Sequence, residues 1–176
     1  EHLYGLTKTD FVRQHTVKHG RIFQVVLVGG GGLLFDLAAN IADIGDLSLC
    51  VCMAPRHAEE LINRASLSKK LEDPGIEYHV VTDPSEITNS IDLSRGSRLV
   101  GIGPAWIIPA RVLELFELCI NVNAIPSPQY QGGAHQTWQI LKGSCVSGCV
   151  IQKMTRDIDR GPVINYVEGR YGETLN

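Results

Sequence analysis

Apolar residues gather in short runs that alternate with stretches of helical periodicity. The first clear run, residues 22–28, contains a single polar residue and ends in four consecutive glycines, Gly29 to Gly32. Behind these glycines, apolar residues recur over 33–41 at the three- and four-residue spacing of an amphipathic helix. The pattern predicts a strand, a glycine turn and a helix. A strand with so few polar residues is typical of a parallel sheet that is covered on both faces.

The same alternation continues as far as residue 122. Further strands are expected at 47–53, 76–81, 98–102 and 119–122, and helices at 55–71, 84–91 and 109–118. Repeated strand–helix units predict a three-layer α/β domain with a mostly parallel, twisted sheet of Rossmann-like topology.

The two ends of the chain have a different texture. A thin apolar pattern over 7–19 predicts a short helix. Beyond residue 123 we expect a loop at 124–133, a helix at 135–141, and strands at 147–154 and 163–167 on either side of a turn at 155–162. Because no linker or repeat interrupts the chain, one domain is expected over 21–176, preceded by an N-terminal segment, 1–20.

Composition narrows the class of protein further. Of the 176 residues, 44% are apolar and 20% are charged, which is ordinary for a globular domain, and the net charge is −3. A protein that binds nucleic acid by neutralising phosphates is usually basic, so nucleic acid is not expected as a partner. No apolar run reaches the roughly 18–20 residues that a membrane span needs, and segment 1–20 has no signal-peptide core. The expected compartment is the cytoplasm.

The cysteines favour neither a disulfide framework nor a metal site. There are five of them, an odd number, and no two have C-x-x-C spacing. Cys50 and Cys52 fall in the strand expected at 47–53, where alternation turns both toward one face and where small buried thiols are common. No metal is therefore expected.

The glycine turn is a first candidate for chemistry, because ligands of open α/β sheets bind beyond the carboxyl ends of the strands. Gly30, Gly31 and Gly32 would present backbone N–H groups at a helix N-terminus, which favours anions such as phosphate. The alternative is a tight turn that needs a positive φ. The turn lacks the spacing of a dinucleotide fingerprint, so NAD is not expected.

The loop after the last parallel strand carries the most specific motif. It contains Asn121, Asn123, Pro128, Tyr130 and Gly132, and Asp159-Arg160-Gly161 follows further along. This stretch resembles the folate-dependent formyltransferase family, whose shared pattern runs Asn-x-His, then Pro-x-Tyr-x-Gly, then Asp-x-Gly. The family includes methionyl-tRNA, sugar-nucleotide and glycinamide ribonucleotide formyltransferases, and the resemblance extends over residues 22–168.

The resemblance implies the formyltransferase fold, with 10-formyltetrahydrofolate as co-substrate and no metal. Folate would contact Gly103, Pro104, Trp106, Ile107, Ile108 and Pro128. The acceptor amine would lie against Gly30, Gly31, Gly32 and Tyr130. Because the chain lacks the second domain of the tRNA-type members and is acidic, a small phosphate-bearing acceptor, such as an amino-sugar nucleotide, fits better than tRNA. An oligomer is compatible with the sequence.

The family's chemistry explains why these residue types recur. When an amine attacks the formyl carbon, the carbonyl oxygen becomes an oxyanion, and the amide of Asn121 can donate a hydrogen bond to it. A carboxylate such as Asp159 can take the amine's proton or hold a histidine in the right state. We therefore expect Asp159 within hydrogen-bonding reach of Asn121 and Asn123, and dependent on backbone N–H donors or water to remain ionised.

Position 123 departs from the family pattern. The family has His there, whereas Asn123 can donate a hydrogen bond but cannot titrate. Three explanations stay open: an engineered His-to-Asn variant, a natural member with weak or altered chemistry, and a relative that binds without turnover. Hydrolysis of the formyl folate to formate is a further activity that the same pocket could support.

Other candidate side chains have plainer interpretations. We expect His57 to be solvated and Trp138 to pack in the core. His135 lies near the start of its helix, where it could compensate for the missing histidine or face solvent. Trp106 could stack on the pteridine ring or pack in the core. Asp157 is expected to be solvated.

Overall fold

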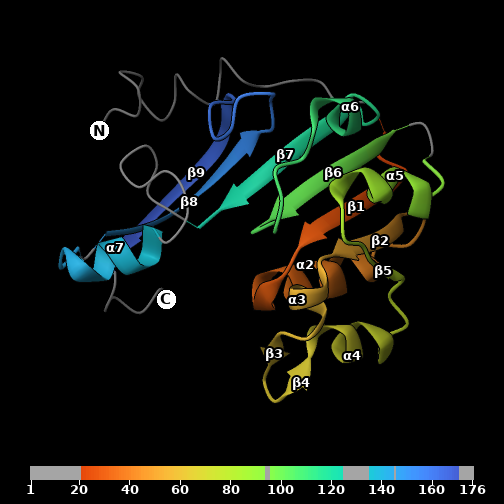
Figure 1. Ribbon diagram of the computed structural model, residues 1–176, viewed down its shortest axis with the longest axis horizontal. Helices are drawn as coiled ribbons and strands as arrows, with labels where there is room; N and C mark the ends of the chain where they lie inside the picture. The colour runs from red at the N-terminus through yellow and green to blue at the C-terminus, as the bar shows by residue number, and fades with distance from the viewer. Residues whose placement is uncertain (1–20, 94–95, 125–134, 145, 171–176) are drawn as a thin grey trace. The chain divides into compact units, whose positions relative to one another are not determined.

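The computed structural model describes residues 21–93, 96–124, 135–144 and 146–170. The chain divides into two compact units, whose described parts lie within 21–120 and 121–170 (Figure 1). The helix predicted at 7–19 and most of the predicted loop at 124–133 lie outside the described residues.

The first unit is built on four parallel strands in the order β5-β2-β1-β6. They are β1 (Gln24–Gly29), β2 (Ser48–Met53), β5 (Tyr78–Val80) and β6 (Ser97–Ile102). The strand predicted first from the sequence is central and buried, since Val26, Leu27 and Val28 are 0% exposed. The mostly parallel sheet that the sequence predicts is confirmed.

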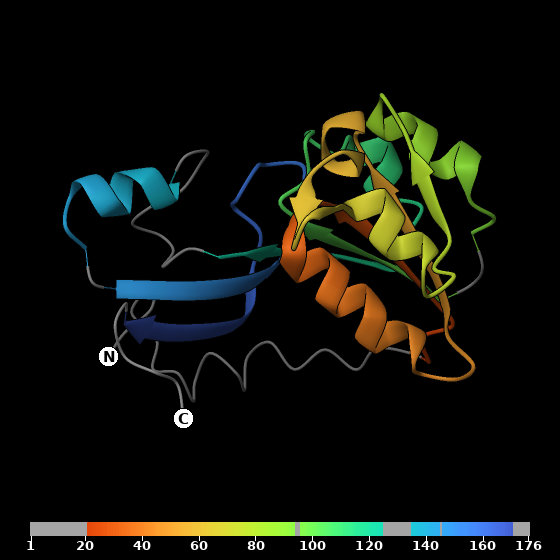
Figure 2. The same cartoon turned by 90° about the horizontal axis from the view of Figure 1, so that it is seen from below.

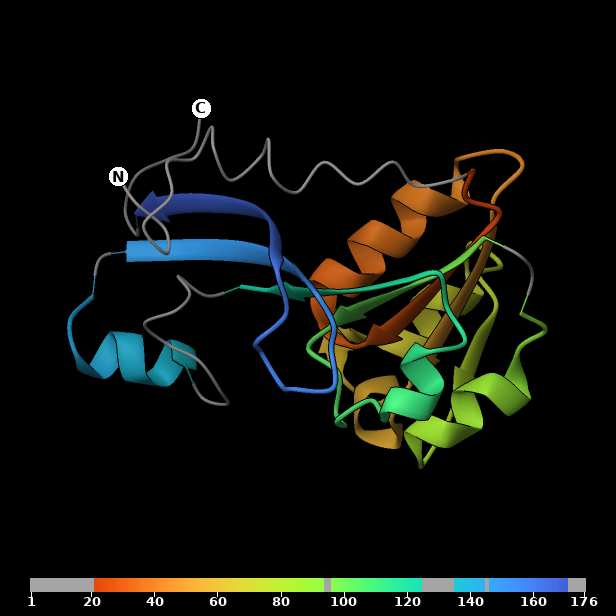
Figure 3. The same ribbon diagram turned by 90° about the horizontal axis from the view of Figure 1, so that it is seen from above.

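Helices cover both faces of this sheet. They are α2 (Gly31–Ala42), α3 (Pro55–Ala58), α4 (Leu67–Glu72), the 3-10 helix η1 (Pro84–Glu86), α5 (Ile87–Ser90) and α6 (Ala110–Leu113). Figures 2 and 3 show α2 on one face and α5 and α6 on the other. Leu34 and Ala38, one helical turn apart on α2, are fully buried, as expected for an amphipathic helix on a sheet. The three-layer α/β architecture is confirmed.

The helix predicted at 55–71 is wrong in its extent. The helix expected at 55–71 is divided into α3 and α4 by a small antiparallel hairpin. The hairpin strands are β3 (Leu61–Ile62) and β4 (Ala65–Ser66). Asn63 and Arg64 form the turn of this hairpin, with φ angles of 51° and 74° that no α-helix contains. Ser66 then begins α4, because its hydroxyl accepts a hydrogen bond from the backbone N–H of Lys69 at 3.3 Å.

The helix expected at 109–118 is also shorter than predicted, because α6 ends at Leu113. The backbone N–H of Glu117 donates to the carbonyl of Ser97 at 3.2 Å, beside the start of β6. The chain has therefore already turned back to the sheet at this point, and β7 (Leu118–Asn123) follows.

The glycine turn is required by the close approach of two backbones. Gly29 has a φ of +137°, and a Cβ atom there would lie 1.8 Å from the carbonyl oxygen of Ile102. The backbone N–H of Gly30 donates to that same oxygen at 3.1 Å. These contacts join the carboxyl ends of β1 and β6, the edge at which ligands of such sheets bind.

The described part of the second unit contains an antiparallel strand pair and the helix α7. Strand β8 (Val146–Lys153) pairs with β9 (Val163–Arg170), and α7 spans His135–Leu141. Val150 and Val163 form a small apolar cluster against which Tyr166 packs. The core position predicted for Trp138 is wrong, because this residue of α7 is 56% exposed.

Among the residues that the structure describes, no helix combines the length and apolar character of a membrane span.

Candidate active site

Two asparagines stand at the carboxyl end of β7. Because side chains alternate along a strand, Asn121 and Asn123 point to the same side. The Nδ2 atom of Asn121 donates a hydrogen bond to Oδ1 of Asn123 at 3.0 Å. The Oδ1 atom of Asn121 is buried and has no hydrogen-bond partner among the described residues. A buried acceptor without a partner is costly, so a donor from a ligand or a water molecule would be stabilising there.

Asp159 joins this pair from the turn between β8 and β9. The Nδ2 atom of Asn123 donates to Oδ1 of Asp159 at 3.3 Å, although 36 positions separate the two residues. The predicted proximity of Asp159 to Asn123 is therefore confirmed. The Nε2 atom of Gln152 donates to the same carboxylate oxygen, also at 3.3 Å. Two side-chain amides thus help to hold this carboxylate.

Gln152 is the site residue that sequence reasoning missed. It is 4% exposed, and it lies at a β-bulge where the pairing of β8 with β9 shifts register after Ile151. A bulge changes the direction of the side chains beside it. The available signal was a polar residue directly after the apolar run 149–151 of this strand, but a strand position alone does not say which neighbour that side chain meets.

The backbone of the turn after β8 explains why Asp and Gly stand at positions 159 and 161. Asp159 has a φ of +54°, in the left-handed region that Asp and Asn tolerate better than most residues. A Cβ atom on Gly161 would lie 1.7 Å from the carbonyl oxygen of Lys153. The backbone N–H of Lys153 donates to the carbonyl of Pro162 at 2.8 Å. The glycine therefore lets the turn close against the end of β8, which brings Asp159 to Asn123.

Gly161→Ala is expected to lower the free energy of unfolding by about 3 kcal/mol, because the added methyl group overlaps a backbone oxygen that cannot rotate away. Chemical denaturation followed by circular dichroism measures this change. Gly143→Ala is the matched control, since Gly143 has a φ of +62° but nothing within 4 Å of its Cβ position. That variant should lose only about 1 kcal/mol, from backbone strain. Equal losses for the two variants would contradict the steric explanation.

In the first unit, the glycine turn packs against His57. A Cβ atom on Gly30 would lie 2.3 Å from Nδ1 of His57, so the missing side chain leaves room for the imidazole. The His57 side chain is only 14% exposed, and its Nδ1 lies 3.3 Å from a carboxylate oxygen of Glu60. The solvated position predicted for His57 is wrong. Sequence reasoning missed this contact because it depends on the absence of a side chain on a distant residue.

Of the three glycines predicted to bind an anion, two have backbone N–H groups that the helix itself does not use. The backbone N–H of Gly30 is already bonded to Ile102. Gly31 and Gly32 open the 12-residue helix α2, and the first N–H groups of a helix have no partner within it. Phosphate contact therefore stays a prediction for Gly31 and Gly32.

The segment after β6 presents one exposed apolar side chain. Ile107 is 66% exposed, whereas Ile108 is 9% exposed and belongs to the core. The indole N–H of Trp106 donates to the carbonyl of Thr82 at 3.1 Å, which fixes one edge of the ring. Gly103 has open space around its Cβ position. The folate contact predicted for this segment stays a prediction, with Trp106 and Ile107 as its best-placed side chains.

Comparison with proteins of known sequence indicates one family. A methionyl-tRNA formyltransferase from Nitrosospira multiformis is 28% identical over 130 residues, which are 70% of this chain and 42% of that protein. In sequence the chain is therefore similar to methionyl-tRNA formyltransferases. It matches no protein-family model, and it spans less than half of the length of the curated relatives that it matches.

Solved structures confirm the formyltransferase fold. A sugar 3N-formyltransferase, crystallised in the presence of dTDP and 5-N-formyl-THF, has a TM-score of 0.67 at 18% identity, over 87% of this chain and 54% of that one. A phosphoribosylglycinamide formyltransferase from Anaplasma phagocytophilum has a TM-score of 0.65 at 20% identity, over 89% of this chain and 76% of that one. At these identities the likeness is one of fold.

This fold thus brings three predicted site residues into one hydrogen-bonded group, Asn121, Asn123 and Asp159. Asp157, two positions before the carboxylate of this group, is exposed as predicted. The remaining predictions for the second unit fall on Pro128, Tyr130 and the side chain of His135, which lie outside the described residues.

Proposed function

We propose that this formyltransferase domain transfers a formyl group from 10-formyltetrahydrofolate to the amine of a small, phosphate-bearing acceptor, such as an amino-sugar nucleotide. The observation that carries the proposal is the group formed by Asn121, Asn123 and Asp159 at the end of β7. It combines an amide donor with a carboxylate, and formyl transfer to an amine needs a donor for the oxyanion and an acceptor for the amine's proton.

Asn121 would serve the formyl oxygen. Its Nδ2 atom donates one hydrogen to Asn123, and an amide nitrogen carries two. The second hydrogen can bond the carbonyl oxygen as the acceptor nitrogen adds to the formyl carbon. Because removal of one such donor costs about 10²–10³ in rate, this contact would be a large part of the catalysis that the domain provides.

Asp159 would serve the attacking amine. As the new carbon–nitrogen bond forms, the amine nitrogen loses a proton to the carboxylate. As the bond between the formyl carbon and the folate nitrogen breaks, that nitrogen takes up a proton, so the reaction is balanced. Asn123 and Gln152 would be positioning residues, because each holds the carboxylate by a 3.3 Å hydrogen bond and neither amide can relay a proton.

Two observations support a phosphate-bearing acceptor. Gly31 and Gly32 open α2, and a helix N-terminus stabilises an anion through its N–H groups and its dipole. The sugar 3N-formyltransferase that shares the fold was crystallised in the presence of dTDP, a nucleoside diphosphate. The net charge of −3 favours such a small acceptor over a long nucleic acid.

Titration of the folded chain with 5-N-formyl-THF is expected to show saturable binding in the micromolar to millimolar range of enzyme substrates. Ile107→Ser should weaken this binding by about tenfold, since burying an isoleucine contributes about 1.5–3 kcal/mol. Leu115→Ser is the matched control, because Leu115 is another exposed apolar residue of the first unit, at 55%. Calorimetry measures both. A folded sample that binds nothing at millimolar ligand would contradict the proposed co-substrate.

Transfer itself is tested by mass spectrometry of an amino-sugar nucleotide incubated with the chain and 10-formyltetrahydrofolate. The expected product is the formylated amine. Formate without formylated amine would favour hydrolysis, and folate binding without either product would favour a binding-only domain.

A further inference from the structure

Four metal-binding side chains share one face at the edge of the parallel sheet. Cys50 and Cys52 lie on β2, and Cys52 is in register with His79 on the edge strand β5. The pairing extends to Glu77, whose carbonyl accepts a hydrogen bond from the backbone of β2 at 2.9 Å. Because residues two apart in a strand face the same side, both cysteines, Glu77 and His79 project from one face.

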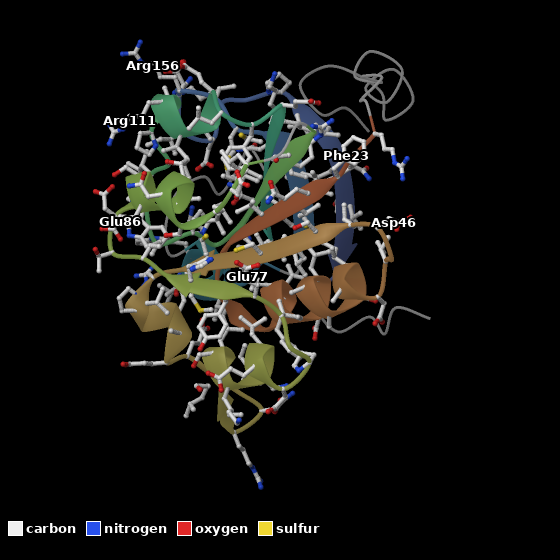
Figure 4. All side chains as sticks on the ribbon, turned by 90° about the vertical axis from the view of Figure 1, so that its right-hand side faces the viewer. Phe23, Asp46, Glu77, Glu86, Arg111 and Arg156 are labelled. Carbon is white, nitrogen blue, oxygen red and sulfur yellow. The ribbon has the colours of Figure 1, made fainter. Side chains whose placement is uncertain are left out.

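Three of these side chains already meet. The Sγ of Cys50, a carboxylate oxygen of Glu77 and a ring nitrogen of His79 all lie within 4.8 Å of one another. The Nε2 of His79 lies 3.2 Å from Oε1 of Glu77. Cys50 is 1% exposed, whereas the side chains of His79 and Glu77 are 32% and 63% exposed. The cluster therefore has a buried sulfur and an open side. Figure 4 shows Glu77 beside β2 and β5.

We propose that Cys50, Glu77 and His79 form a binding site for a divalent zinc-type cation. Thiolate sulfur, imidazole nitrogen and carboxylate oxygen are the three ligand types that Zn²⁺ takes in proteins, at about 2.0–2.3 Å. Tetrahedral ligands at those lengths are about 3.5 Å apart, so the side chains of Glu77, which is exposed, and His79, which is partly exposed, need move only about 1 Å. The fourth position would go to water or to Cys52.

The sequence expectation of no metal rested on the lack of C-x-x-C spacing. That pattern describes ligands on turns and knuckles, whereas here they come in pairs two residues apart on neighbouring strands. The site arises only when β2 and β5 pair, and for that reason spacing along the chain did not reveal it.

Zinc binds cysteine as the thiolate, so the thiol of Cys50 must lose its proton when the cation binds. Its hydrogen bond with Cys52, and then its burial, raise the pKa of the Cys50 thiol above the ordinary value. Without a cation the sulfur is therefore protonated at neutral pH. A bound cation supplies the positive charge that stabilises the thiolate, so binding should release a proton.

The proposal goes beyond formyl transfer, and its test does not depend on activity. The full chain, freed of metal with a chelator, is titrated with Zn²⁺ by calorimetry and with Co²⁺ by absorption, where a sulfur-to-cobalt charge-transfer band reports a thiolate ligand. We expect one site per chain, with that band. Cys50→Ser and His79→Gln should each weaken zinc binding by about 100-fold. Loss of a hydrogen-bond partner outside the ligand set can already cost that much, and these two substitutions remove ligands themselves.

Cys119→Ser is the matched control. Cys119 is buried at 4% exposure, and its thiol donates to the carbonyl of Leu113 at 3.3 Å, away from the proposed ligands. This variant should bind zinc as the parent does. His79→Gln keeps the test decisive if Cys50→Ser does not fold, because His79 lies at the partly exposed edge strand. No zinc binding by the folded parent, or unchanged binding in His79→Gln, would overturn the proposal.

Discussion

Asn123→His is expected to raise the rate of formyl transfer by about 10²–10⁴-fold, the factor that a well-placed general acid–base contributes. Asn123 bonds Asn121 at 3.0 Å on one side and Asp159 at 3.3 Å on the other. An imidazole in this place can donate one N–H to the carboxylate and exchange a proton through its other nitrogen, which an amide cannot do. The measurement is kcat with saturating folate and acceptor.

The same variant should acquire a pH dependence that the parent lacks. An imidazole has an ordinary pKa of about 6.5, and the neighbouring carboxylate of Asp159 raises it by favouring the charged form. A general base works when deprotonated, so the rate should rise with pH through that raised pKa and level off above it. In the parent, position 123 carries no titrating group, so this limb should be missing.

Asn165→His is the matched control for both effects. Asn165 is an exposed asparagine on β9, so the substitution adds an imidazole to the same unit without adding one to the hydrogen-bonded group. It should leave the rate and the pH profile unchanged. If Asn123→His binds folate but gains no transfer with any amine tested, the general-base role is contradicted and a binding-only domain is favoured.

The fold was predictable where one local pattern decided the structure. The apolar run that becomes β1 has no polar face, so only a buried strand satisfies it, and the glycines behind it allow the backbones of Gly29 and Ile102 to touch. The helix predicted over 55–71 failed because helical apolar spacing continues through the hairpin. Two residues with positive φ, Asn63 and Arg64, interrupt it, and apolar periodicity does not record that change.

The site was predictable where motif and topology agreed. Asn123 ends a strand, and Asp159 lies in the turn between β8 and β9 at the same sheet edge, so their contact followed from the family pattern. Gln152 was not predictable, because its direction depends on the register shift between β8 and β9. The zinc-type cluster around Cys50 was not predictable either, because it depends on which strands become neighbours.

Asp159→Asn is expected to lower formyl transfer by about 10²–10⁴-fold, because it removes the only proton acceptor of the hydrogen-bonded group. The substitution keeps the shape of the site. An amide oxygen can still accept the hydrogen bonds that Asn123 and Gln152 donate to Oδ1. Asparagine also tolerates the φ of +54° that Asp159 adopts, so the turn should be retained. The loss should therefore appear in kcat, with the folate affinity changed far less.

Steady-state kinetics and folate calorimetry on the same samples separate chemistry from binding. Both are measured in the parent and in the Asn123→His background, where the higher starting rate lets a larger loss of kcat be measured. Asp157→Asn is the matched control, since Asp157 lies two positions away in the same turn and its side chain is exposed; it should retain the parental rate. A parental kcat in Asp159→Asn would remove this carboxylate from proton handling. An equal loss of folate binding would instead assign Asp159 to holding the site together, because a group that acts only in the transition state leaves the ground-state complex intact.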